Sequence, residues 1–348
     1  RIVEKVEQLL ARVNAARERL ARVPAILKRF RQAVLASACS GRLTADWREQ
    51  HPEVEPASKL LLSIEKFRSE RAEKGRQARR VRSVPAEFDD EQDETVRGEL
   101  PESWTWCRVD QTATVCLGGT PSRKKHSYWN GDVAWVSSGE VANCRINTTR
   151  ERITCEVLTD SNAKVYPRGT VLVAMIGEGK TRGQAAILDI DACTNQNVAG
   201  LVFDTGCIVS DFVWFWALSQ YERNRAVGRG GAQPALNGEK VRALTLPLPP
   251  FDEQTEIVRR VEALFKLADA IEKRVAAATA RAEKLTQAIL AKVFRGELVP
   301  TEAELARREG RPCESASALL VRLRAERNAA RQPEMWNSKR GTRQTKGA

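Results

Sequence analysis

The sequence predicts an α+β protein, in which a mixed α/β domain is flanked by two long helices that form an antiparallel coiled coil. Three observations lead to this fold class. Residues 1–45 align without gaps to residues 256–300, and about a third of the paired positions are identical. Both segments carry an apolar heptad pattern, which is typical of coiled-coil helices. Between them, short β-branched runs separated by turn residues indicate strands.

The two copies of the repeat share one heptad register, in which apolar residues recur at alternating steps of four and three. In the first copy the pattern runs through Ile2, Val6, Leu9, Val13, Ala16, Leu20, Val23, Leu27, Phe30 and Val34. In the second it runs through Ile257, Val261, Leu264, Ala268, Ile271, Val275, Ala278, Ala282, Leu285 and Ile289. Because an apolar seam cannot stay exposed, we expect the two copies to pack on each other. Pairing of each copy with a partner chain is the alternative.

Glycine and proline residues indicate where these helices are expected to end or to kink. Gly41 and Gly296 occupy matching positions and are natural helix stops. Pro24 lies inside the first copy and is expected to kink or restart that helix. A weaker echo pairs residues 57–61 with residues 316–320. Residues 57–80 are predicted to form a second, charged helix.

The chain between the copies has the short strand and helix patterns that are typical of one globular domain. Residues 131–137, 169–175 and 184–190 are β-branched or apolar runs, and residues 211–226 look helical. The predicted organisation is a helical region, an acidic linker, a mixed α/β domain, a second helical region and a disordered basic tail. These segments are residues 1–82, 83–99, 100–250, 251–331 and 332–348.

Composition favours a polyanionic partner, with nucleic acid ahead of an acidic membrane surface. The chain has 57 Lys and Arg against 45 Asp and Glu, a formal net charge of +12. A basic protein without such a partner is the alternative. Residues 101–250 hold 16 Lys and Arg against 14 Asp and Glu, so DNA binding by this domain must come from local clusters.

Eight cysteines show no zinc-knuckle or CxxC spacing, and the chain has two histidines, so no metal site is expected. We interpret the cysteines as reduced, mostly buried residues of a cytoplasmic protein. No apolar run approaches the ~20 residues that a membrane span needs, and no signal peptide is visible.

An ordered set of motifs resembles the specificity subunits of type I restriction-modification systems. The set comprises Leu100-Pro-Glu-Ser-Trp, Gly118-Gly-Thr-Pro-Ser-Arg, Tyr128-Trp-Asn-Gly-Asp-Val, Pro167-Arg-Gly-Thr-Val-Leu-Val, Thr194-Asn-Gln-Asn-Val-Ala and Leu246-Pro-Leu-Pro-Pro-Phe-Asp-Glu-Gln. Each piece is weak alone, but the order and the flanking repeat make the set specific. The resemblance covers about residues 1–330.

The resemblance implies a non-catalytic subunit that binds double-stranded DNA and directs methyltransferase and restriction subunits to a split target. It implies a target recognition domain that reads half of the target, and a coiled coil that sets the spacer and docks methyltransferase subunits. S-adenosylmethionine, ATP and magnesium are then expected on the partner subunits. Seam and docking roles are expected for Val261, Leu264, Ile271, Leu285 and Ile289.

The first copy starts at Arg1, whereas the second is preceded by a Pro-rich run. We therefore expect that an N-terminal recognition domain is missing or encoded elsewhere. Self-association of two chains would then restore a second recognition domain.

Candidate DNA-binding residues fall into four groups, each with a structural alternative. Three consecutive cations suit phosphates, a glycine-rich turn and a loop after the predicted helix carry cations and amides, and a strand end carries two serines. The residues are Ser122, Arg123, Lys124 and Lys125; Lys180, Thr181, Arg182 and Gln184; Arg225, Arg229, Gln233 and Asn237; and Ser137 and Ser138. The alternative is that these are ordinary solvated or connecting loops. Asn195-Gln196-Asn197 reads adenine or satisfies buried backbone groups.

Two further readings are open to test. Residues 177–181 resemble a nucleotide-binding loop, but Ala174 stands where the first glycine belongs and a strand is predicted afterwards. The helix–domain–helix order also fits a structural coiled-coil protein with a globular hinge. That reading leaves the Pro-Leu-Pro-Pro run and the Gly-Gly-Thr-Pro-Ser-Arg loop unexplained. The five tryptophans 104, 106, 135, 214 and 216 are predicted to be core residues.

Overall fold

The computed structural model describes residues 1–76, 99–177, 180–226 and 236–330. It divides into two compact units: Pro24–Glu272, here called the globular unit, and Arg1–Val23 with Lys273–Ala348, here called the helical unit. Two long helices, α1 (Ile2–Cys39) and α9 (Phe251–Phe294), contribute to both units. The expected linker 83–99, except Glu99, and the expected tail 332–348 lie outside the described residues.

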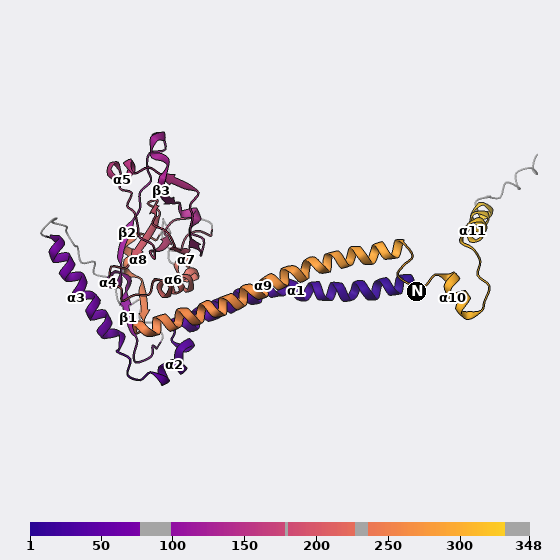
Figure 1. Cartoon of the computed structure of the whole chain (residues 1–348), viewed down its shortest axis with the longest axis horizontal. Coiled ribbons are helices and arrows are strands. Elements are labelled where there is room, and N and C mark those ends of the chain that lie inside the picture. Colours follow the sequence, from indigo (N-terminus) through magenta and orange to yellow (C-terminus); the bar gives the residue numbers. More distant parts are fainter. Residues whose placement is uncertain (77–98, 178–179, 227–235, 331–348) are drawn as a thin grey trace, which may run out of the picture. The chain divides into compact units, whose positions relative to one another are not determined.

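The globular unit carries the strands, and its described elements follow in chain order (Figure 1). The helices after α1 are η1 (Arg42–Thr44), α2 (Ala45–Gln50), α3 (Ala57–Arg76), α4 (Val109–Thr112), η4 (His126–Tyr128), η5 (Ser138–Glu140), α5 (Glu156–Asp160), α6 (Ser210–Ser219), α7 (Tyr221–Ala226) and α8 (Gly238–Ala243). The strands are β1 (Thr105–Arg108), β2 (Thr114–Leu117), β3 (Trp129–Val136), β4 (Arg145–Ile146), β5 (Glu151–Ile153), β6 (Val171–Ala174), β7 (Ala185–Leu188), β8 (Cys193–Thr194), β9 (Val198–Val202) and β10 (Thr245–Leu248).

Among the described residues the strands form three sheets. The largest has the order β2-β9-β6-β7-β4, in which only the β4–β7 pair is parallel. A second sheet has the order β5-β3-β8, and β1 pairs with β10 in a third. The β1–β10 pair joins the two ends of the domain, because β1 opens it and β10 leads directly into α9. The strands predicted within residues 131–137, 169–175 and 184–190 are confirmed as β3, β6 and β7.

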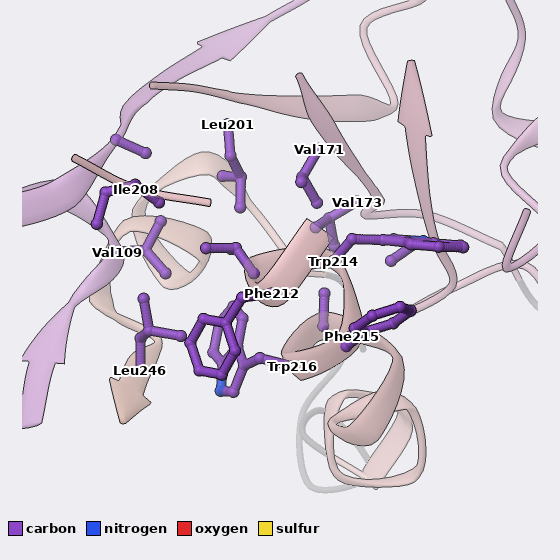
Figure 2. Packing of buried hydrophobic residues seen from close by; sticks show 14 of the residues in the cluster. Val109, Val171, Val173, Leu201, Ile208, Phe212, Trp214, Phe215, Trp216 and Leu246 are labelled. Atoms are coloured by element: carbon purple, nitrogen blue, oxygen red, sulfur yellow. The ribbon is translucent and has the colours of Figure 1, made fainter. Parts of the chain in front are cut away.

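The main core lies between α6 and the five-stranded sheet. Phe212, Trp214 and Trp216 of α6 pack with Val171, Val173 and Leu201 of the sheet (Figure 2). Trp104 meets Phe212 edge to face, with the ring centroids 6.4 Å apart. The predicted core role is confirmed for Trp104, Trp135, Trp214 and Trp216, while Trp106 is half-buried. The helix predicted over residues 211–226 is interrupted at Gln220, where α6 ends and α7 begins.

The helical unit consists of one end of the coiled coil followed by two short helices. Val13 of α1 is buried against Ala282 and Ile289 of α9, and Arg17 forms an ion pair with Glu283 at 4.0 Å. In the globular unit, Arg31 of α1 binds Asp269 at 2.7 Å and Glu272 at 2.9 Å. Higher numbers on α1 meet lower numbers on α9, so the predicted antiparallel pairing within one chain is confirmed.

One seam prediction on α9 is wrong. Leu285 is 51% exposed, whereas Thr286 is half-buried and Ile289 is buried. The covered position after Ala282 is four residues on, at Thr286, instead of three, and Ile289 three residues later lies again on the predicted register. Val261, Leu264, Ile271 and Ile289 are buried or half-buried, as the seam prediction requires.

The glycine stops are confirmed, but the proline break is not. The α1 helix ends at Cys39 and α9 ends at Phe294, with Gly41 (φ +74°) and Gly296 (φ +72°) in the left-handed conformation just beyond. At the second stop, the Glu297 N–H donates to the Lys292 carbonyl at 2.9 Å. Helix α1 runs without interruption through Pro24, so this residue does not restart it.

The internal repeat continues beyond the long helices. After α1 come α2 and α3; after α9 come α10 (Glu302–Glu309) and α11 (Ala316–Ala330). Helix α3 lies against β1 and α4 and buries Ile64, whereas the matching Leu323 of α11 is 50% exposed. The same apolar pattern is therefore covered in the first copy and uncovered in the second.

Candidate nucleic-acid interface

Three loops meet at one end of the five-stranded sheet, here called the loop end. They are residues 175–184 between β6 and β7, residues 137–143 after β3, and residues 195–197 between β8 and β9. The Met175 N–H donates to the Asn197 carbonyl at 2.9 Å, and the Ala185 N–H donates to Asn143 Oδ1 at 3.0 Å. These bonds hold loops that are distant in sequence beside one another.

The β6–β7 loop presents the predicted residues Lys180, Thr181, Arg182 and Gln184. Its described part ends in a turn at Gly183 (φ +81°), where the Gln184 N–H donates to the Thr181 carbonyl at 3.0 Å. Lys180 is exposed, and the Tyr221 hydroxyl donates to its carbonyl at 2.8 Å. Strand β7 follows, in place of the helix that a nucleotide-binding loop requires. The loop therefore has the form of a hairpin that displays side chains.

The two serines after β3 already have partners within the domain. The Ser137 hydroxyl donates to Glu140 Oε2 at 2.8 Å, and the same oxygen accepts the Ser137 N–H at 2.9 Å. Ser138 Oγ accepts a bond of 3.4 Å from the Asn195 amide. Both serines lie at the loop end, but the Ser137 hydroxyl closes the first turn of η5 and is engaged.

Within the β8–β9 turn, the inner and outer side chains have different roles. Asn195 is buried, and its side-chain oxygen accepts the Asn197 N–H at 3.2 Å. This matches the structural alternative for that amide. Gln196 is exposed and accepts a hydrogen bond from the Thr120 hydroxyl. The Gly118–Ser122 segment is thereby brought to the loop end, which the sequence did not reveal.

The predicted cation cluster at residues 122–125 is placed around β3, β5 and α5. Arg123 forms a bidentate pair with Glu151 and stacks on Trp129, with its guanidinium carbon 3.8 Å from the ring centroid. Lys125 binds Glu156 at 2.7 Å. Hydrogen bonding to Glu151 raises the pKa of Arg123 and to Glu156 raises that of Lys125. Lys124 is exposed and has no ion pair among the described residues.

The structure does not bring all predicted groups together. In Figure 1 the labels α5 and β3 lie at the upper end of the domain, whereas α6 and α7 lie at the end next to α9. Asn237 caps α8, and its side-chain oxygen accepts the Lys240 N–H at 2.8 Å. Arg225 lies on α7. The predicted residues Arg229 and Gln233 lie outside the described residues.

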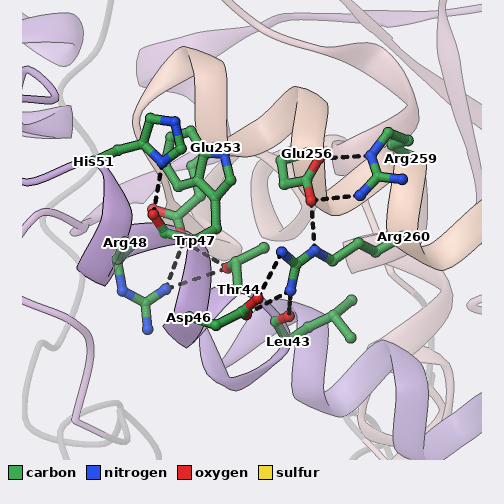
Figure 3. Close-up of polar contacts among 10 residues, drawn as sticks. All are labelled: Leu43, Thr44, Asp46, Trp47, Arg48, His51, Glu253, Glu256, Arg259 and Arg260. Atoms are coloured by element: carbon green, nitrogen blue, oxygen red, sulfur yellow. Dashed lines mark hydrogen bonds and ion pairs between the residues drawn. The ribbon is translucent and has the colours of Figure 1, made fainter.

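A buried polar joint connects the domain to α9 (Figure 3). Glu253, in the first turn of α9, is fully buried. Its Oε1 accepts bonds from Thr44 Oγ1 at 2.6 Å and Arg48 Nη1 at 2.5 Å, and its Oε2 accepts the Trp104 indole N–H at 2.8 Å. The segment that contains Thr44 and Arg48, the residue Trp104 and the start of α9 therefore meet at one carboxylate.

A second set of charges extends the joint along α9. Arg260 donates to Asp46 at 2.6 Å and 3.0 Å, to the Leu43 carbonyl at 2.8 Å and to Glu256 at 2.5 Å. Hydrogen bonds from Arg259 and then Arg260 lower the pKa of Glu256 to about 2. The Arg260 hydrogen bond also lowers the pKa of Asp46. Sequence analysis missed this joint, because Glu253 and Asp46 look like ordinary surface acids at helix starts.

No group of three or more His, Cys, Asp or Glu in residues 1–76, 99–177, 180–226 and 236–330 is placed to hold a metal ion. All eight cysteines are free, and six are buried or half-buried. No described helix is long and apolar enough to cross a membrane.

Comparison with known proteins gives the family. The family described as "Type I restriction modification DNA specificity domain" matches residues 101–278. This chain belongs to that family. The EcoDI specificity subunit of Escherichia coli is 31% identical over 337 residues, which cover 94% of this chain and 67% of that subunit. The EcoBI specificity subunit of Escherichia coli is 32% identical over 339 residues, with 94% and 62% covered.

Solved structures of low identity agree on the fold. The HsdS subunit from Thermoanaerobacter tengcongensis superposes with a TM-score of 0.50 at 20% identity, covering 85% of this chain and 58% of that one. The chain thus spans about two thirds or less of the relatives that it matches. The family domain coincides with the mixed α/β domain plus the first part of α9. Glu253 and Trp104 of the joint therefore lie inside the matched region, whereas Thr44 and Arg48 precede it.

Proposed function

We propose that this chain is a sequence-specific DNA-binding subunit of a type I restriction-modification complex, which directs methyltransferase and restriction subunits to a split target. The observation that carries the proposal is the match of 94% of the chain to specificity subunits at about 31% identity. The alternative, a structural coiled-coil protein with a globular hinge, does not account for that match. We also propose that the chain acts in the cytoplasm.

The loop end is proposed to read bases, and the cations around β3 to bind phosphates. Half-exposed Arg182 and Gln184 supply the forked donor and the amide that base edges require, and exposed Lys180 lies beside them as a backbone contact. Ser122, Arg123, Lys124 and Lys125 supply phosphate contacts, of which Lys124 has no competing ion pair within the described residues. Thr181, Ser138 and the exposed Gln196 complete the proposed reading surface.

The chain is proposed to be non-catalytic and to hold its enzymatic partners on the long helices. Leu267, Leu285, Leu290 and Phe294 of α9 are exposed apolar residues, which suit docking of methyltransferase helices. Leu285 is exposed and is therefore proposed as a docking residue rather than a seam residue. S-adenosylmethionine, ATP and magnesium are proposed to sit on the methyltransferase and restriction subunits.

Methylome sequencing of a host that expresses this chain with its cognate methyltransferase subunit tests the function. One modified split motif is expected, and a symmetric motif would indicate that two chains associate. A Gln184→Ala variant should relax one base position and cost about 1–3 kcal/mol there. Absence of modification by a stably assembled complex would contradict the proposal.

A further inference from the structure

A cavity of about 790 Å³ lies inside the globular unit, between the loop end and the two long helices. Lys28, Arg31 and Gln32 of α1 form one wall, and Lys180 and Gln184 of the β6–β7 loop form the facing wall. Leu35 of α1, Leu218 and Trp214 of α6 and Phe265 of α9 form its apolar floor. The proposed base-reading loop and the coiled-coil helix therefore border the same space.

Some polar side chains on the two walls already have ion-pair partners in the chain, and others do not. Arg31 is held by Asp269 at 2.7 Å and Glu272 at 2.9 Å, and is neutralised. Lys28 and Lys180 are exposed and have no ion pair or side-chain hydrogen bond among the described residues. The side-chain amides of Gln32 and Gln184 likewise have no partner within the described part of the chain. Two cations and two side-chain amides therefore line one cavity, and their hydrogen-bond donors have no partner among the described residues.

The indole of Trp214 lies on the apolar floor of the same cavity. Its side chain is 8% exposed, and its N–H has no acceptor in the described residues. One carboxylate lining the cavity, Asp269, is paired with Arg31, which leaves Glu222 against Lys28 and Lys180. The balance of charge and free donors favours an anionic group that accepts several hydrogen bonds.

We propose that this cavity binds a phosphodiester of the DNA backbone, held between Lys28 and Gln32 of α1 and Lys180 of the recognition domain. The inference rests on the proposed function and adds a second DNA-contacting element, the coiled-coil helix. A duplex on the loop end passes the mouth of this cavity because Lys180 and Gln184 belong to both. The contact fixes the duplex relative to α1 without reading sequence, since phosphates carry no base information.

The geometry favours DNA over a free nucleotide. Nucleotide sites cradle phosphate with consecutive backbone amides at a helix N-terminus. Here the donors are side chains from the middle of α1 and from a hairpin, and β7 follows that hairpin. Donors spread over two elements suit a chain that passes through and extends beyond the cavity on both sides.

Salt-dependent DNA binding tests the inference. The purified chain is titrated with a duplex carrying its motif and with a scrambled duplex, between about 50 and 200 mM salt. Lys28→Ala should weaken binding to both duplexes by the same factor and lower the slope of log K against log salt by about one. Lys28→Arg should restore the slope. The matched control is Arg29→Ala, which removes an exposed cation next along α1 that does not line the cavity.

The outcomes separate the inference from the function on which it rests. If Lys28→Ala still binds its motif specifically and the salt slope is unchanged, the cavity does not bind a DNA phosphate. The proposed function is then unaffected. Failure of the unmodified chain to prefer its motif overturns the proposed function. If AMP raises the melting temperature of the unmodified chain but not of Lys28→Ala, the cavity holds a free nucleotide and the DNA assignment is wrong.

Discussion

The indole N–H of Trp104 donates a hydrogen bond of 2.8 Å to Glu253 Oε2, across the boundary between the globular domain and α9. The other oxygen of this buried carboxylate accepts bonds from Thr44 and Arg48. A buried charge is tolerated when it is paired and fully hydrogen-bonded, and it becomes costly when one partner is removed. The joint therefore ties the start of α9 to Trp104 and to the segment that contains Thr44 and Arg48.

Glu253→Ala should destabilise the globular unit by about 3–5 kcal/mol, because it leaves Arg48 and Trp104 without their acceptor. Urea unfolding followed by tryptophan fluorescence measures this change. Glu49→Ala, an exposed acid on α2, is the control and should change stability by less than about 0.5 kcal/mol. Equal stability of the two variants would show that the hydrogen bonds of Glu253 do not stabilise the globular unit.

The two copies of the repeat allow a matched comparison of burial. Ile64 of α3 is fully buried against the domain, so Ile64→Ala should cost about 2–5 kcal/mol. The equivalent change in α11, Leu323→Ala, removes an exposed side chain and should change the free energy of unfolding by less than about 0.5 kcal/mol. A large loss in Leu323→Ala would mean that α11 is covered in solution.

The revised seam on α9 predicts opposite outcomes for two neighbouring positions. Ile289 packs on Val13 and is 5% exposed, so Ile289→Asp should separate the ends of the helices and lower the helical circular dichroism signal. Leu285→Asp should leave that signal unchanged and weaken methyltransferase docking, measured by co-purification. Loss of helicity in Leu285→Asp would instead show that Leu285 is covered by α1 and belongs to the seam.

Glu256 makes stability depend on pH. Its pKa lies at about 2 in the folded chain, below the ordinary value of 4.5, because Arg259 and Arg260 hydrogen-bond to its charged form. The stabilisation is complete above about pH 4.5 and disappears as the pH falls towards 2. Since Arg259 is 68% exposed and screened by solvent, we expect about 1 kcal/mol.

In urea unfolding, Glu256→Gln should therefore be less stable than the parent at pH 7, and this difference should shrink as the pH falls through about 2. Glu262→Gln, which removes an acid without an ion pair among the described residues, is the control. A constant difference between Glu256→Gln and the parent from pH 7 to pH 2 would contradict this assignment.

Local pattern explains which parts of the fold were predictable. Heptads ending at Gly41 and Gly296, the β-branched runs of β3, β6 and β7, and the four buried tryptophans depend on residues close in sequence or on strong periodicity. The limits of such patterns appear at Leu285, which lies on the predicted register but is exposed while the adjacent Thr286 is half-buried. They appear again at Gln220, where the helix expected to run to residue 226 is interrupted.

The candidate site was less predictable, because side-chain partners are set by tertiary contacts. Sequence selected Ser137, Arg123, Lys125 and Asn237 for their chemistry, and the fold engages each with another group of this domain. Lys124, Lys180 and Gln184 keep uncommitted side chains within the described residues. Gln196 and Lys28 emerged only when distant segments were brought together.

By itself, the sequence determined the helix–domain–helix order, the repeat and the family, because these are recorded in spacing and motif order along one chain. Tertiary structure decided which cations remain free, which helix face is covered, and that Glu253 joins three distant elements. Those properties depend on distances between segments up to about two hundred residues apart, which folding creates by burying the shared apolar faces.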